Sequence, residues 1–188
     1  MPGSRRLVVT ENITANGVIE FIDDWFDPAE QEDVDDIFAV MREQMANEEA
    51  LLLGRKTFEA FRGYWPQQTE DASGSADHLN RVPKYVVSST MTDPEWANST
   101  VLSGRLEDEV AALKAEGDGG ELGVTGSISV VHALIGADLV DEYRLFVYPV
   151  LSSRGRNLMA DGVALQGLTL AECRSFRSGI VLQVYARR

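Results

Sequence analysis

The sequence predicts an α/β protein whose mainly parallel sheet ends in an antiparallel hairpin. Short apolar runs alternate with segments of helical periodicity as far as about residue 136, and this alternation is typical of parallel sheets. The C-terminal part has strand patterns instead, and Ser178-Gly179 separates two of them at hairpin spacing. With 188 residues, no internal repeat and no linker, the chain is expected to form one domain over residues 1–188.

Hydrophobic periodicity places the individual elements. One helix shows apolar residues at i, i+3, i+4, i+7 and i+11, namely Val34, Ile37, Phe38, Met41 and Met45. Further helices are expected over 55–61, from Leu106 and after Ser127. An extended segment is expected at 18–22 and a polar surface loop at 67–76. The predicted strands are 7–10, 51–53, 85–87, 101–102, 122–125, 143–151, 168–176 and 180–185.

Composition excludes several classes of function. The net charge is −13, and the segment 20–49 carries −11 of it, with twelve acidic residues and one base. This acidic surface argues against nucleic-acid binding, and its residues are also those of an ordinary solvated helix and loop. No apolar run reaches about 18 residues, so no membrane span is expected. Cys173 is the only cysteine, which suits a reducing cytoplasm.

The most informative segment is the run of three leucines into Gly54-Arg55-Lys56-Thr57. It predicts a buried strand, a tight turn and the first turn of a helix. Free backbone N–H groups and the helix dipole favour an anion at such a helix start, and two cations stand beside it. The turn is therefore a candidate phosphate site. The alternative is an ordinary solvated strand-to-helix turn.

Two more turns follow predicted strands, at Ser88-Ser89 and at Gly126-Ser127-Ile128. In an open parallel sheet all three turns would lie at the carboxyl edge, where ligands bind, and together they favour a dinucleotide. Neither a G-x-G-x-x-G fingerprint nor a P-loop is present. Ser127 is expected to be the N-cap of the helix after it, with its hydroxyl accepting from backbone N–H groups two or three residues on.

Metal and nucleophile chemistry find little support. His78 and His132 are the only histidines, and neither has a ligand at i+3 or i+4, so no metal site is expected. His132 borders an apolar helix face and is more typical of a packing residue. Cys173 alternates with small residues in a strand and has no neighbouring histidine, which favours a structural thiol.

The ordered set of motifs resembles the dihydrofolate reductase-like superfamily. The similarity is greatest to the branch that contains the reductase domain of riboflavin-biosynthesis deaminase-reductases and small stand-alone bacterial proteins. The motifs that carry the resemblance are LLLGRKTF at 51–58, PKYVVS at 83–88, WANSTV at 96–101, VTGSI at 124–128, LVDEYRLFVYPV at 139–150 and FRSGIVLQVY at 176–185.

The resemblance implies an NADPH-dependent reductase. Arg55 and Thr57 would contact cofactor phosphates, and Ser88 and Ser89 would lie near the adenosine 2′-phosphate. A guanidinium also suits that phosphate because it can fork onto two oxygens. The turn at 126–128 would cradle the pyrophosphate. The implied cofactor-binding residues are Gly54, Arg55, Lys56, Thr57, Ser88, Ser89, Gly126, Ser127 and Ile128.

In dihydrofolate reductases a helix carboxylate stands beside the substrate, and here Asp33 and Asp35 are the candidates. Both could equally be acids that the helix dipole favours near an N-terminus. The chain departs from the family pattern at Asn16-Gly17, where Asp-Gly is usual. It departs again at 152–156, where Arg154 and Arg156 could meet an anionic substrate or solvent.

These observations predict a homodimeric reductase that moves a hydride from NADPH to a small C=N or C=O group. A pteridine, a ribosylaminopyrimidine phosphate and an unrelated heterocycle remain open as substrates. The dimer is expected because the strand at 143–151 is apolar on both faces. The alternative is a ligand-binding protein on the same fold without turnover.

Overall fold

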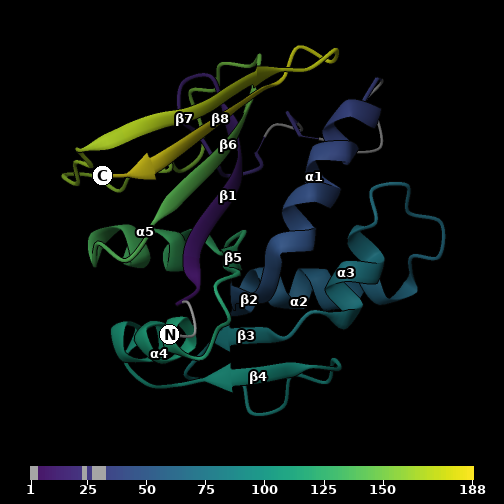
Figure 1. Cartoon of the computed structure of the whole chain (residues 1–188), viewed down its shortest axis with the longest axis vertical. Coiled ribbons are helices and arrows are strands. Elements are labelled where there is room, and N and C mark those ends of the chain that lie inside the picture. Colours follow the sequence, from purple (N-terminus) through teal and green to yellow (C-terminus); the bar gives the residue numbers. More distant parts are fainter. Residues whose placement is uncertain (1–3, 23–24, 27–32) are drawn as a thin grey trace.

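The computed structural model describes residues 4–22, 25–26 and 33–188, and an eight-stranded sheet runs through it (Figure 1). The strand order is β4-β3-β2-β5-β1-β6-β8-β7. The pairs among β1 to β6 are parallel, whereas β8 is antiparallel to β6 and β7, which confirms the predicted fold class. The strands are β1 (Arg6–Thr14), β2 (Glu48–Gly54), β3 (Lys84–Val87), β4 (Ser99–Leu102), β5 (Glu121–Val124), β6 (Glu142–Tyr148), β7 (Leu168–Ser175) and β8 (Val181–Arg187).

Helices cover both faces of the sheet (Figure 1). On one face α4 and α5 enclose a core with β1, β2 and β5; on the other, α1 packs on β6 and β8 while α2 and α3 pack on β2 and β3. The helices are α1 (Asp35–Asn47), α2 (Arg55–Tyr64) with the 3-10 turn η1 (Trp65–Gln67), α3 (Ser75–Arg81), α4 (Leu106–Ala115) and α5 (Ile128–Gly136).

The continuous leucine run of β2 reflects burial on both faces. Successive side chains of a strand point to opposite faces. Leu52 therefore packs toward α4 and α5, while Leu51 and Leu53 pack toward α2 and α3. All three are at most 3% exposed. A parallel strand in the middle of an α/β sheet selects such a run, because neither face meets water.

One short helix was not predicted, and it begins at the end of the predicted loop. Helix α3 begins at Ser75, inside the polar stretch 67–76. Asp71 holds its start, since one carboxylate oxygen accepts from the Ala76 N–H at 2.8 Å and the other accepts from the Ser73 N–H at 3.0 Å. With seven residues, α3 is too short to show a clear helical period.

Two predicted extended segments are shorter than expected. The stretch 18–22 forms only an isolated bridge, between Val18 and Asn157. Strand β6 ends at Tyr148 rather than at residue 151. Pro149 follows it, and proline has no N–H with which to continue the ladder.

The amino end of the sheet contains a buried network of ion pairs. The Arg144 guanidinium donates to both oxygens of Glu121, at 2.7 and 2.8 Å, and to one oxygen of Glu142 at 2.8 Å. Arg6 donates to the same two carboxylates at 2.7 and 2.8 Å. The side chain of Arg144 is 11% exposed, whereas that of Arg6 is 51% exposed. The two arginines therefore balance the same acids from different environments.

Replacing Arg144 by methionine should strongly destabilise the fold. The substitution leaves Glu121 and Glu142 buried with only one cation, and breaking a buried ion pair in this way costs about 3–5 kcal/mol. The matched variant Arg6→Met removes an exposed partner of the same acids and should cost no more than about 1 kcal/mol. Urea unfolding followed by circular dichroism measures both. Equal losses for the two variants would contradict the unequal roles assigned here.

Candidate active site

The carboxyl ends of β1 and β5 form a topological switch point. The chain leaves β1 through α1 on one face of the sheet and leaves β5 through α5 on the other. Pairing between the two strands stops at Val9 and Val124, while β1 goes on pairing with β6 as far as Thr14 and Tyr148. In open α/β sheets, ligands bind outside the strand ends at such a point.

Two of the three predicted turns touch each other at this edge. The Gly54 N–H donates to the Gly126 carbonyl at 3.3 Å. A Cβ on Gly54 would lie 2.5 Å from Ser127 Oγ, and one on Gly126 would lie 2.8 Å from Thr57 Oγ1. Gly126 also has φ of +104° and is joined to Ser127 by a cis peptide bond. Both positions therefore require glycine for the turns to approach this closely.

Ser127 does not cap α5 with its side chain, so that prediction was wrong. It stands at the N-cap position, but its Oγ accepts from the Thr57 N–H of α2 at 3.1 Å. Thr57 lies in the first turn of α2, where backbone N–H groups have no intrahelical partner. The serine hydroxyl thus ties the two turns together. The N–H groups of Arg55 and Lys56 also precede the first intrahelical hydrogen bond of α2.

The two predicted cations of α2 are both exposed but have different acidic neighbours, Glu59 for Arg55 and Glu20 for Lys56. Arg55 Nη1 lies 3.0 Å from each carboxylate oxygen of Glu59.

A third cation, Arg156, belongs to the segment 152–156, and its Nη2 lies 2.6 Å from Glu20 Oε1. This hydrogen bond lowers the pKa of Glu20, and the charge of Lys56 lowers it further. Arg156 is thus paired with Glu20 near the start of α2.

Ser88 and Ser89 follow β3, which is the neighbour of β2 in the sheet, with Val87 in register with Gly54. Ser88 Oγ accepts from the N–H groups of Thr90 at 3.2 Å and Met91 at 3.0 Å, so it shapes the loop. Ser89 is exposed. The third turn thus lies at the same sheet edge as the first two.

The carboxylates predicted for catalysis are both exposed. Asp33 has a 67% exposed side chain, and its Oδ1 lies 3.9 Å from Arg177 Nη1 in the β7–β8 turn. Asp35 is in the first turn of α1. Neither is enclosed, as a proton donor in a water-excluding site would be. Their catalytic role stays a prediction.

A buried acid that the sequence interpretation missed lies on the central strand. Glu11 is 7% exposed, and its Oε1 has no hydrogen-bond partner among the described residues. Burial raises the pKa of Glu11 to about 8. The sequence pattern could have shown this, because Leu7, Val9 and Glu11 are two residues apart on one strand and therefore point to the same, core-facing side. An acid at an inward position of a core strand is a marker of functional sites.

Trp25 and Phe26, which lie between β1 and α1 in the chain, pack on the core. Their rings lie 5.5 and 5.6 Å from that of Tyr148 in edge-to-face geometry. Phe21 stacks on Phe26 at 4.5 Å and remains 54% exposed. Phe21 therefore presents an exposed aromatic ring directly after Glu20.

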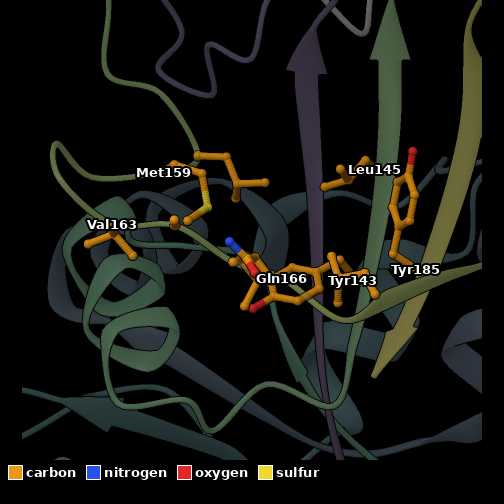
Figure 2. A pocket seen from close by; sticks show the side chains of 10 residues that line it. Tyr143, Leu145, Met159, Val163, Gln166 and Tyr185 are labelled. Carbon is orange, nitrogen blue, oxygen red and sulfur yellow. The ribbon is translucent and has the colours of Figure 1, made fainter. Parts of the chain in front are cut away.

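A separate apolar cavity of about 440 Å³ lies between β6, β8 and the segment 158–168 (Figure 2). Tyr143 and Tyr185 form its sheet side, and Met159 and Val163 stand opposite. None of the predicted cofactor residues lines it.

The part of the chain that the structure describes meets the requirements neither of a metal site nor of a membrane-spanning helix. Within it, no group of three or more His, Cys, Asp or Glu side chains could hold a metal ion. No helix there is long and apolar enough to cross a membrane. Cys173, which the sequence favoured as a structural thiol, is exposed on β7.

Comparison with known proteins identifies the family. The model of the RibD C-terminal domain matches residues 15–182. An uncharacterized protein of Bacillus subtilis (strain 168), YyaP, is 30% identical over 141 residues, which are 73% of this chain and 73% of that protein.

Two crystal structures share the fold at lower identity. A putative riboflavin biosynthesis protein from Shewanella sp. PV-4 superposes with a TM-score of 0.72 at 18% identity, covering 97% of this chain and 99% of that one. A pyrimidine reductase-like protein from Corynebacterium diphtheriae gives 0.66 at 14% identity, covering 97% and 91%. The chain therefore belongs to the RibD C-terminal domain family, with a dihydrofolate reductase-like fold.

Proposed function

We propose that this protein is an NADPH-dependent reductase that transfers a hydride to a C=N or C=O group of a small heterocyclic substrate. Family membership supports a reductase, since the two solved relatives are a putative riboflavin biosynthesis protein and a pyrimidine reductase-like protein. The observation that carries the proposal is the contact between the Gly54 and Gly126 turns at the switch point. Two helix N-termini meet there, which suits a pyrophosphate.

The chain's own residues would bind and orient the cofactor, which when bound supplies the hydride. The N–H groups of Arg55 and Lys56 and the start of α5 at Ile128 would receive the pyrophosphate. Gly126 would keep the two turns close enough to form this cradle, because a Cβ there would lie 2.8 Å from Thr57 Oγ1. Ser127 has its hydroxyl committed to Thr57 and would hold the cradle together rather than touch the ligand.

Arg55, Ser88 and Ser89 would bind the 2′-phosphate. The ion pair between Arg55 and Glu59 is exposed and has i, i+4 spacing, so it contributes only about 0.3–0.5 kcal/mol. Arg55 can therefore exchange it for a forked contact with phosphate, which is stronger.

Exposed aromatic surface near the cradle favours a flat heterocycle as the substrate. Phe21 follows Glu20, whose carboxylate lies in the field of Lys56. The exposed ring of Phe21 provides a stacking face of the kind that binds heteroaromatic ligands. A pteridine and a ribosylaminopyrimidine phosphate both fit this description.

We also propose that a second copy of the chain covers the cavity side of β6, β8 and β7. Tyr143, Tyr185 and Leu170 form one row across these strands, by register. Leu170 is 51% exposed, and the cavity beside it has mostly apolar walls. Such a surface suits a homodimer contact rather than a charged substrate.

The protein should bind NADPH at least about tenfold more tightly than NADH, because a charge-assisted contact with the 2′-phosphate contributes about 1.5–3 kcal/mol. Arg55→Ala should remove most of that preference. Fluorescence titration measures both affinities, and NADPH oxidation with a panel of pteridines and ribosylaminopyrimidine phosphates measures turnover. Equal affinities for the two cofactors would refute the site; tight binding without turnover on any substrate would favour the ligand-binding alternative.

Gly126→Ala should weaken NADPH binding more than Ser127→Ala does. The added Cβ meets Thr57 Oγ1 and intrudes on the cradle at a positive φ, whereas Ser127→Ala removes one hydrogen bond at about 1 kcal/mol of stability. Titration on protein whose fold is checked by circular dichroism compares them. Unchanged binding by folded Gly126→Ala would place the cofactor elsewhere.

Light scattering at micromolar concentration should give the mass of a dimer. Leu170→Asp should shift the protein to monomer, because a charge would be buried at the contact. Tyr64→Asp is the matched control, since Tyr64 is 55% exposed on α2, on the other face of the sheet. A monomeric parent protein would rule the dimer out.

A further inference from the structure

Glu11 occupies a core position of β1 that an apolar side chain would fill at lower cost. Leu7 and Val9 precede it on the same face of the strand, and both are 0% exposed in the core beneath α4 and α5. Glu11 itself is 7% exposed, with Oε1 unpartnered among the described residues. An unpaired polar group in a core destabilises the fold. An unpaired polar group at a core position is typical of functional sites.

The register places this carboxyl group at the switch point. Val9 pairs with Val124, so Glu11 and Gly126 each come two residues later along parallel strands. On the other side Glu11 is in register with Leu145 of β6. Glu11 therefore stands level with the Gly126 turn, on the α5 side, where β1 has stopped pairing with β5.

No neighbouring charged side chain accounts for the raised pKa of Glu11. Burial is the cause that raises its pKa, to about 8. The titratable groups of the elements on this face include His132 on α5, Tyr143 on β6 and Tyr185 on β8. His132 Nε2 lies 2.8 Å from the Asn157 carbonyl oxygen, and burial raises the pKa of Tyr143 to about 12. Glu11 is thus a neutral acid at neutral pH, with a proton to give.

We propose that Glu11 is the acid of the active site and holds the proton that the reduction consumes. This inference rests on the proposed function. Glu11 donates its proton to the nitrogen or oxygen of the C=N or C=O group, while the carbon of that group accepts the hydride supplied by NADPH. The π bond breaks, and its electron pair takes the proton. Glu11 is left as a carboxylate and is reprotonated from water.

The charge difference between the two forms of the cofactor provides the test. Oxidised nicotinamide carries a positive charge that the reduced ring lacks, and a nearby cation favours an ionised carboxyl group. NADP⁺ binding should therefore release a proton from Glu11, whereas NADPH binding should not. The NADP⁺ affinity should rise relative to the NADPH affinity by up to about tenfold per pH unit between about pH 6 and 8. The 2′-phosphate titrates in both cofactors and cancels.

Calorimetric titration of both cofactors, in two buffers of different ionisation enthalpy, measures the proton release. Glu11→Gln should bind both cofactors and lose the pH-dependent difference between them. Glu172→Gln should keep it, because Glu172 pairs with Arg174 at 2.8 Å on the edge strand β7. In turnover, Glu11→Gln should lower kcat at least about tenfold and remove the corresponding limb of the pH profile.

A stability measurement verifies that the variant is folded and that the parent carboxyl group is neutral. A raised folded-state pKa means that folded Glu11 keeps a proton that the unfolded chain releases above about pH 4.5. The stability of the parent should fall as pH rises from about 4.5 to 8, and glutamine does not titrate. The Tm advantage of Glu11→Gln over the parent should therefore grow across that range.

Each outcome bears on a different proposal. Proton release that is equal for NADP⁺ and NADPH in the parent protein would overturn the role of Glu11 and leave the cofactor site intact. Failure of the parent to bind either cofactor would overturn the proposed function and this inference with it. The comparison within the parent needs no variant. If Glu11→Gln is unfolded, Glu11→Asp retains a shorter acid and should show a reduced but measurable difference.

Discussion

The register between β1 and β5 decides where the candidate active site of this molecule lies. Four residue pairs join the two strands, and the pairing ends at Val9 and Val124. The crossovers that follow run to opposite faces of the sheet, because the chain continues from β1 to β2 and from β5 to β6. The chain therefore leaves the two strand ends toward opposite faces of the sheet, through α1 and through α5. The Gly126 turn, the start of α2 and Glu11 all take their positions from this switch point.

Buried acids lie near both ends of β1, and their surroundings differ. At the amino end, every carboxylate oxygen of Glu121 and Glu142 accepts a hydrogen bond from Arg6 or Arg144. Toward the carboxyl end, Glu11 is buried without a cation and is held neutral. Balanced charge can stabilise a fold, whereas an unbalanced acid costs stability and has a proton available. The structural ion pairs and the proposed proton donor are thus separated along β1.

The junction of the Gly54 and Gly126 turns is a constraint of a different kind. It depends on the absence of two side chains and on one hydroxyl, that of Ser127, which crosses to α2. The solved relatives keep the fold at 18% and 14% identity. Layers and crossovers need only a burial pattern, which many sequences provide. A close approach of two backbones needs particular residues at particular positions, so it is where the chemistry of one chain becomes specific.

The sequence by itself determined the strands, the longer helices, the three strand-end turns and the family, because periodicity and turn residues are local signals. Helix α3 was too short to show a period. The tertiary structure alone decided that Ser127 bonds to Thr57, 70 residues away, and that Arg156 pairs with Glu20, 136 residues away. It alone placed Glu11 beside the switch point, with Oε1 unpartnered among the residues that the structure describes. Such pairings depend on which strand ends meet, and no local pattern records the partner that a side chain finds, or lacks, across the fold.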